Sequence, residues 1–124
     1  MEYINCDKAP EAIGPYSQAI KAGNFLFVSG QIPINPFTKK IERGSIEDLT
    51  ELVLENIKNI VISADFKIEN IVKVTIFLKN INNFDKVNKV YAKFFQNHKP
   101  ARAVVEVSNL PKNVDIEIEA ICFK

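Results

Sequence analysis

A strict alternation of charged and apolar residues at 115–120, DIEIEA, constrains the fold more than any other feature. Successive side chains of a β-strand point to opposite faces, so the three acids would share one face and the isoleucines and the alanine the other. A strand of this kind lies in a sheet packed on one face only, because strands buried on both faces are apolar throughout. The sheet is therefore predicted to have one polar face.

Two segments have the spacing of amphipathic helices. Apolar residues recur at helical intervals within residues 45–64, where Ser45 and Asp48 resemble a capping box at the start. Residues 84–97 repeat the pattern, and Pro100 prevents that helix from continuing. Two helices can cover only one face of a sheet, which agrees with the polar face expected from the alternation.

Apolar and alternating runs predict the strands and complete the fold class. The expected strands are a hairpin within 17–30 around a Gly23-Asn24 turn, a β-branched strand at 71–79 buried on both faces, and closing strands at 101–108 and 114–123 around a turn at 110–113. Residues 31–44 are expected to form a surface loop. The predicted order is β-β-α-β-α-β-β, an α+β fold with both helices on one sheet face.

Composition narrows the class of protein. The 124 residues, 47% of them apolar, predict a single domain over 1–124. Sixteen basic and fifteen acidic residues leave a net charge of +1, without the like-charge block expected for nucleic acid or an anionic membrane. The segment at the N-terminus lacks signal-peptide features and no apolar run approaches a membrane span, so we expect a cytoplasmic protein.

Cys6 and Cys122 lack the spacing of a zinc site and are expected to be reduced, with a disulfide as the alternative.

Arg102 is unexpected within the apolar strand 101–107. A guanidinium there must reach solvent, pair with an acid, or bind an anion from outside. Because side chains alternate along a strand, Arg102, Val104 and Glu106 share one face, and we expect them on the open, polar face of the sheet. Ala103, Val105 and Val107 share the other face of the strand, and we expect them to join the core under the helices. The sequence does not determine which glutamate lies nearest Arg102, because the register of the closing strands depends on the turn between them. Such a face also suits an oligomer interface.

Five motifs occur in order along the chain: IGPYSQA at 13–19, VSGQIP at 28–33, FDKVNKVYAKFF at 84–95, PARA at 100–103 and EVSNLPKNVDIEIEA at 106–120. Through them the sequence resembles the RidA family, also called YjgF or reactive-intermediate deaminase, over nearly its whole length. The resemblance implies a chorismate-mutase-like fold and homotrimers whose sheets form a central barrel, with active sites between subunits. It also implies hydrolysis of 2-imino acids, such as 2-iminopropanoate and 2-iminobutanoate, to 2-keto acids and ammonia without a metal or organic cofactor.

The same resemblance assigns roles to particular residues. Arg102 corresponds to the carboxylate-binding arginine and Glu117 to the water-positioning glutamate, a role for which Glu119 competes. The implied lining of the pocket comprises Tyr16, Ser29, Gly30, Asn88 and the backbone at Val104. A planar guanidinium holds a carboxylate through two hydrogen bonds, and a nearby carboxylate can hold water over C2 and transfer protons. His98, the only histidine, is expected at an exposed helix end without a catalytic role.

Two departures from the family pattern and three alternatives remain. Val104 stands where many relatives carry cysteine, and the segment before PARA is short, which puts substrate preference in doubt. Arg102 could instead pair with a glutamate as a structural bridge. An endoribonuclease or translation inhibitor is the second alternative, although a near-neutral chain with one histidine argues against RNA cleavage. A non-enzymatic small-carboxylate binder or chaperone-like trimer is the third, and it would need Arg102 but not Glu117.

Overall fold

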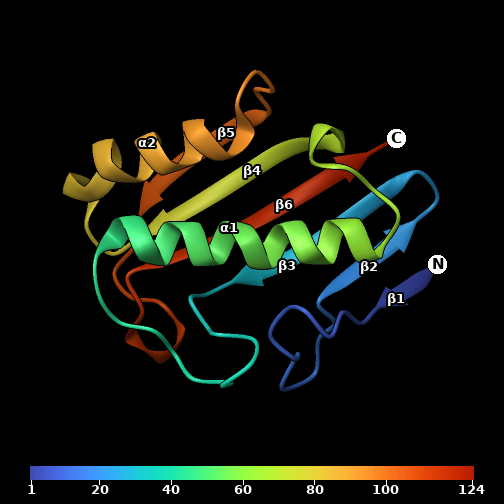
Figure 1. Ribbon diagram of the computed structural model, residues 1–124, viewed down its shortest axis with the longest axis horizontal. Helices are drawn as coiled ribbons and strands as arrows, with labels where there is room; N and C mark the ends of the chain where they lie inside the picture. The colour runs from blue at the N-terminus through green and yellow to red at the C-terminus, as the bar shows by residue number, and fades with distance from the viewer.

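The computed structural model describes residues 1–124 and consists of two helices packed on one face of a six-stranded sheet (Figure 1). The strands are β1 (Glu2–Ile4), β2 (Ala19–Ala22), β3 (Phe25–Gln31), β4 (Ile71–Leu78), β5 (Ala101–Glu106) and β6 (Ile116–Phe123). The helices are α1 (Ile46–Ser63) and α2 (Phe84–Phe95). The α+β class and the predicted elements are confirmed, and the short strand β1 is an addition to them.

The two helices form where the sequence predicts them. At the start of α1, the backbone N–H of Asp48 donates a hydrogen bond of 3.1 Å to Ser45 Oγ, which satisfies one of the free donors of the first turn. Helix α2 ends before Gln96, whose φ of 55° breaks the helical path. Neither helix combines the length and the apolar composition needed to cross a bilayer.

The order of strands across the sheet is β1-β2-β3-β6-β4-β5. The two closing strands therefore do not pair with each other, contrary to the expectation that their turn sets their register. Strand β6 lies between β3 and β4 and is antiparallel to both, whereas β5 lies parallel to β4. Parallel neighbours need a crossover rather than a tight turn, and α2 supplies it. As a result β5 is an edge strand, with one row of backbone groups that no strand pairs.

The hydrophobic core lies between the helices and one face of the sheet. Helix α1 packs across β3 and β6, and the buried side chains of β6 include Ile116, Ile118 and Ala120, as the alternation predicts. Burial on both faces of β4 is a wrong prediction: Ile76 is fully buried, but Thr75 and Phe77 are partly exposed. No second layer covers the other face within one chain, so an apolar strand is left half open.

Strand β5 also differs from its prediction. Arg102 is aligned with Val74 and Val104 with Ile76, and both of these β4 residues are buried under the helices. Arg102 and Val104 therefore lie on the helix side, whereas Val105 lies on the open side and is 40% exposed. The prediction was right that Arg102 and Val104 share one face of the strand and Val105 the other. It assigned each group to the wrong face of the sheet. At an edge strand the helix layer gives incomplete cover, so apolar content does not reveal which side faces inward.

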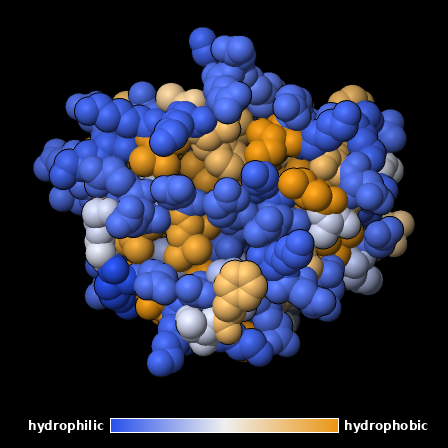
Figure 2. All heavy atoms as spheres, viewed as in Figure 1, coloured by the Kyte–Doolittle hydropathy of each residue, from blue (hydrophilic) through white to orange (hydrophobic).

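Exposed aromatic side chains gather on the open face of the sheet. Phe25, Phe27 and Phe123 are 42%, 45% and 46% exposed, and the Phe25 ring centroid lies 5.8 Å from that of Phe27 and 5.0 Å from that of Phe123. The helix-covered side presents mainly hydrophilic side chains, with smaller hydrophobic areas between them (Figure 2). The open face thus carries a contiguous aromatic patch that a single chain leaves in water.

Both cysteines are buried, and no disulfide joins them. The Cys6 thiol donates a hydrogen bond of 3.4 Å to the backbone carbonyl oxygen of Asn59. Burial raises the pKa of the Cys122 thiol to about 12, so this group is protonated at neutral pH. Cys122 is therefore not a reactive thiolate in this fold.

Candidate functional site

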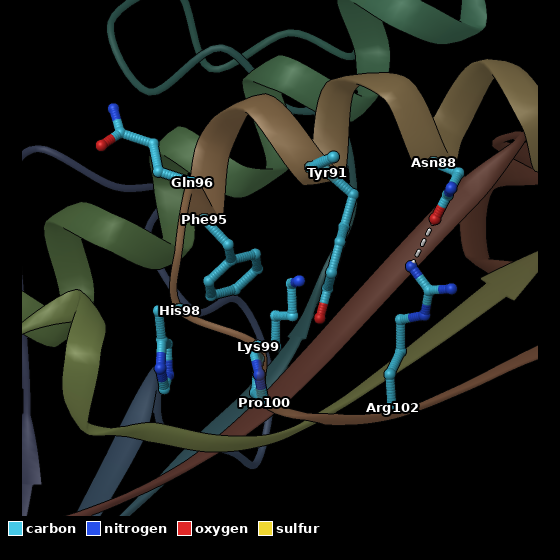
Figure 3. A pocket seen from close by; sticks show the side chains of 9 residues that line it. Asn88, Tyr91, Phe95, Gln96, His98, Lys99, Pro100 and Arg102 are labelled. Atoms are coloured by element: carbon cyan, nitrogen blue, oxygen red, sulfur yellow. Dashed lines mark hydrogen bonds between the residues drawn. The ribbon is translucent and has the colours of Figure 1, made fainter.

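Arg102 extends from β5 beneath α2 and is held there by neutral partners (Figure 3). Its Nη1 donates a hydrogen bond of 2.7 Å to Asn88 Oδ1. Its Cζ lies 4.7 Å from the ring centroid of Tyr91 and 5.6 Å from that of Phe84, which orients the planar group by cation–π contact. The chain has two ion pairs and Arg102 belongs to neither, so Arg102 is not a structural bridge to a glutamate.

A cavity of about 400 Å³ opens beside this guanidinium, between α2 and the segment that leads into β5. Its polar lining includes Asn88, Lys99 and Arg102, and no aspartate or glutamate contributes to it. Two cationic side chains without an acidic counterpart make the cavity electropositive. The residue types and their arrangement therefore suit an anion such as a carboxylate.

His98 lies at the same cavity but not as predicted. It is half-buried instead of exposed, and its Nε2 donates a hydrogen bond of 2.6 Å to the backbone carbonyl oxygen of Ile71. This bond ties the short segment after α2 to the start of β4. The expectation failed because a contact between residues so far apart in the chain leaves no local pattern. The bond gives His98 a structural role.

Tyr91 is a cavity residue that the sequence indicated only as part of a helix face. It lies one turn after Asn88 on α2, is 7% exposed, and its hydroxyl has no hydrogen-bond partner. Burial raises its pKa, and the charge of Arg102 acts in the opposite direction. The spacing of three residues from Asn88 was the available signal, since residues three apart share a helix face.

A second cavity of about 870 Å³ lies on the other side of the sheet and collects most of the remaining predicted residues. Tyr16, Ser29, Gly30 and Glu117 all line it, and Glu119 does so as well. Tyr16 is exposed, whereas the Ser29 hydroxyl is fixed by a hydrogen bond of 2.6 Å to the backbone carbonyl oxygen of Ser17. The charged residues of the lining are Glu11, Glu117, Glu119, Lys39 and Lys112.

Glu117 sits directly over Gly30. A Cβ atom added at Gly30 would lie 2.9 Å from Cδ of Glu117 and closer still to its Oε2, so no larger residue fits beside this carboxyl group as it stands. Burial raises the pKa of Glu117, and the negative charge of Glu119 raises it further. Glu117 is thus a half-buried carboxyl group suited to accept and return protons.

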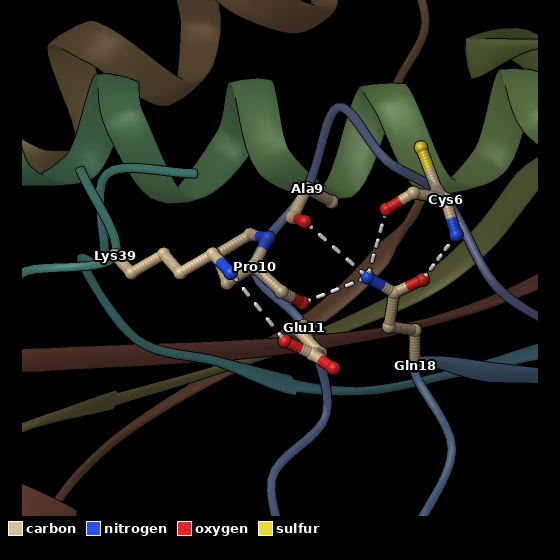
Figure 4. Close-up of polar contacts among 6 residues, drawn as sticks. All are labelled: Cys6, Ala9, Pro10, Glu11, Gln18 and Lys39. Carbon is tan, nitrogen blue, oxygen red and sulfur yellow. Dashed lines mark hydrogen bonds and ion pairs between the residues drawn. The ribbon is translucent and has the colours of Figure 1, made fainter. Parts of the chain in front are cut away.

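The wall of the second cavity is fixed by Gln18, which sequence reasoning did not assign (Figure 4). This buried amide accepts a hydrogen bond of 2.6 Å from the Cys6 N–H and donates to the carbonyl oxygens of Cys6, Ala9 and Pro10, with the shortest bond, 2.7 Å, to Pro10. It therefore holds residues 6–10 in place. The available signal in the sequence was the position of Gln18, a polar residue of the IGPYSQA motif directly before an apolar strand.

The two cavities lie on opposite faces of the sheet. Arg102 has the orientation of Val74, which faces the helices, whereas Glu117 is aligned with Phe77 on the open face. One chain therefore brings Arg102 together with Asn88, and Glu117 together with the Tyr16 group, but it does not join the two sets. Val104 is packed against the core on the Arg102 side, on the edge strand.

No three His, Cys, Asp or Glu side chains form a group that could hold a metal ion. The chemistry that the residues themselves can perform is binding of an anion in the first cavity and proton transfer through a carboxyl group in the second. These are complementary parts of one acid–base site if the two cavities meet.

Comparisons with known proteins place the chain among close relatives. The model of the family described as endoribonuclease L-PSP matches residues 6–124. A RutC family protein of Pyrococcus horikoshii is 58% identical over 123 residues, which are 99% of this chain and 98% of the relative. A solved structure of a Rid family protein from Yersinia pestis is 48% identical, with a TM-score of 0.97 and coverage of 99% and 98%. Escherichia coli TdcF with bound serine is 42% identical, with a TM-score of 0.95 and coverage of 100% and 99%.

Proposed function

The chain belongs to the endoribonuclease L-PSP family, which is the YjgF/RidA family, and from this premise we propose that it hydrolyses 2-imino acids to 2-keto acids and ammonia. The observation that carries the proposal is the unpaired guanidinium of Arg102 at the edge of an electropositive cavity. The substrates proposed first are 2-iminopropanoate and 2-iminobutanoate. Bound serine in the related TdcF is a ligand with a carboxylate of the same kind.

The proposed active site is formed between two chains of a homotrimer. Arg102, Asn88 and the β5 backbone at Val104 would come from one chain, and Glu117 with the Tyr16 group from its neighbour. Three features support this assembly: the two sets lie on opposite faces of the sheet, β5 has a free edge, and the open face carries an aromatic patch. Joining chains through that face would bury the patch and bring the sets together.

The proposed chemistry follows from these positions. The Arg102 guanidinium binds the substrate carboxylate through two hydrogen bonds and fixes the plane of the adjacent C=N bond. Glu117 holds a water molecule over C2 and accepts a proton as the water oxygen bonds to that carbon. The nitrogen gains protons, the C–N bond breaks, and ammonia leaves as the carbonyl forms. One imine and one water thus give one 2-keto acid and one ammonia.

The direct test is a decay assay. The two imines are generated in situ from their amino acids, and semicarbazide traps the fraction that survives. We expect the wild-type protein to accelerate imine loss above the spontaneous rate at catalytic concentration. A folded protein that gives no acceleration would refute the proposed activity.

An endoribonuclease is a second candidate, because the description of the family names that activity. The net charge of +1 and the absence of a basic track do not suit the RNA backbone. RNA degradation that persists in an Arg102→Ala protein, after removal of contaminating nucleases, would favour this candidate. A carboxylate binder without catalysis would instead keep its ligand in Glu117→Gln and lose it in Arg102→Ala.

Replacing Glu119 with glutamine should move the acidic limb of the pH–rate profile to lower pH. Glu117 must be deprotonated to accept a proton from water, so kcat/KM falls as the pH drops through its pKa. The negative charge of Glu119 raises that pKa, and its removal lowers it. The measurement is kcat/KM for 2-iminobutanoate across pH. Complete loss of activity in Glu119→Gln would instead assign the water-positioning role to Glu119.

Replacing Gly30 with alanine should reduce kcat/KM by on the order of tenfold while the melting temperature stays close to that of the wild type. The added methyl group collides with the Glu117 side chain, whose atoms are the three nearest to it, and displaces the carboxyl group. A double-mutant cycle with Glu117→Ala supplies the control, because the glycine change should have no further effect once that carboxyl group is absent. Additive losses would contradict a direct contact.

A further inference from the structure

We propose that the cavity beside Arg102 binds a second anionic group on the ligand, so that dicarboxylic 2-imino acids, such as 2-iminosuccinate and 2-iminoglutarate, are preferred substrates. This inference rests on the proposed imine hydrolysis and specifies its substrate class. The residues that would take the second anion are Lys99 and Tyr91 (Figure 3).

The charge of the cavity exceeds what a monocarboxylate needs. Arg102 alone neutralises the carboxylate that every 2-imino acid carries, and Lys99 adds a second positive charge to the same cavity. The two ion pairs of the chain are Lys39 with Glu11 and Lys58 with Glu55, so neither cation of the cavity has an acidic partner. No acidic side chain lines the cavity, which leaves Lys99 available to an anion from outside.

Tyr91 supplies an independent observation. Its side chain is 93% buried, because only 7% is exposed, and its hydroxyl has no hydrogen-bond partner in the protein. A buried hydroxyl without a partner costs free energy, and a ligand oxygen that accepts its hydrogen bond would remove that cost. Tyr91 extends from α2, and Lys99 from the segment before β5, into the space beside Arg102 (Figure 3).

The size of the cavity suits a longer side chain than methyl or ethyl. Its volume of about 400 Å³ lies in the range typical of small-molecule sites. Lys99 lies three residues before Arg102 in the chain, and both side chains line this one cavity. Their long side chains can therefore converge on the two ends of a four- or five-carbon dicarboxylate. His98 is not available for this role, because its Nε2 already donates to the backbone of Ile71.

The test compares kcat/KM for 2-iminobutanoate and 2-iminoglutarate, both generated in situ, in wild type, Lys99→Met and Tyr91→Phe. The wild type should favour 2-iminoglutarate, and the ratio of the two kcat/KM values should fall by on the order of tenfold in Lys99→Met. Tyr91→Phe should lower the same ratio less, because one neutral hydrogen bond is lost. The loss should appear mainly in KM, as expected for a group that binds rather than reacts.

A matched control is Lys93→Met, which removes an exposed lysine from α2 outside the cavity and should keep the wild-type ratio. A readout apart from turnover is the affinity for the product 2-ketoglutarate relative to 2-ketobutanoate, measured by calorimetry. Preference for the dicarboxylate that Lys99→Met removes would support the inference. Equal affinity for both products in the wild type would overturn it.

The two proposals can fail separately. If the wild type hydrolyses 2-iminobutanoate at least as well as 2-iminoglutarate, and Lys99→Met changes both rates alike, the second anion site is wrong and imine hydrolysis stands. If no imine is hydrolysed but 2-ketoglutarate binds in a manner that depends on Lys99, the activity is wrong and the anion site stands. Lys99 is exposed, so its replacement should not disturb folding.

Discussion

Arg102→Ala should lower kcat/KM for hydrolysis of 2-iminobutanoate at least about 100-fold, a loss of roughly 3 kcal/mol of transition-state stabilisation. Two charge-assisted hydrogen bonds to the substrate carboxylate disappear, and nothing else in the first cavity presents a planar pair of donors. The measurement is imine decay under semicarbazide trapping, with the wild type and the variant at equal concentration.

Two controls separate binding from folding. Arg102 packs against the ring of Tyr91 and bonds to Asn88, so the melting temperature of the variant must be measured beside its activity. Arg102→Lys keeps the positive charge but loses the planar guanidinium and its paired N–H donors, so it should recover only a small part of the rate. Full activity in a folded Arg102→Ala protein would mean that the cavity beside α2 is not where the substrate carboxylate binds.

Mixing two inactive variants should restore activity. Arg102→Ala retains Glu117, and Glu117→Gln retains Arg102. If each site takes Arg102 from one chain and Glu117 from its neighbour, randomly mixed trimers will contain about one quarter intact sites. Co-refolded or co-expressed variants should therefore regain about a quarter of wild-type kcat per site, whereas either variant alone shows little turnover.

The outcome of mixing depends on the geometry of a single chain. Arg102 and Glu117 lie on opposite faces of one sheet, so a site within one chain is not available to them. No recovery in mixtures that light scattering shows to be mixed trimers would contradict the shared site. A monomeric mass at micromolar concentration would contradict the assembly itself.

Local patterns were sufficient for most of the fold. Helix α1 begins at the Ser45 cap and α2 covers the predicted residues, because capping and helical spacing are properties of neighbouring residues. The alternation in β6 likewise placed Ile116 in the core and Glu117 on the open face. Such patterns were decisive wherever an element has one face in the core and the other in water.

The pattern was insufficient where the faces of an element are both partly apolar. Strand β4 reads as buried throughout, yet one of its faces is open in the single chain, and β5 has its inward and outward faces exchanged relative to the prediction. The residues predicted for the site from their motifs line one or the other of the two cavities, apart from Val104, which packs against the core. Tyr91 and Lys99 were not identified, because a helix-face aromatic and a surface lysine look the same whether or not they border a cavity.

The sequence by itself determined the order of the main elements, the packing of both helices on one face of the sheet and the residue types that could bind a carboxylate and move a proton. Only the tertiary structure decided that β6 lies between β3 and β4, and hence that Arg102 and Glu117 lie on opposite faces. Strand insertion is a choice among long-range pairings whose free energies depend on the whole core. The alternation of side chains within a strand does not indicate which strands will pair with it, because the alternation is the same whatever its neighbours are.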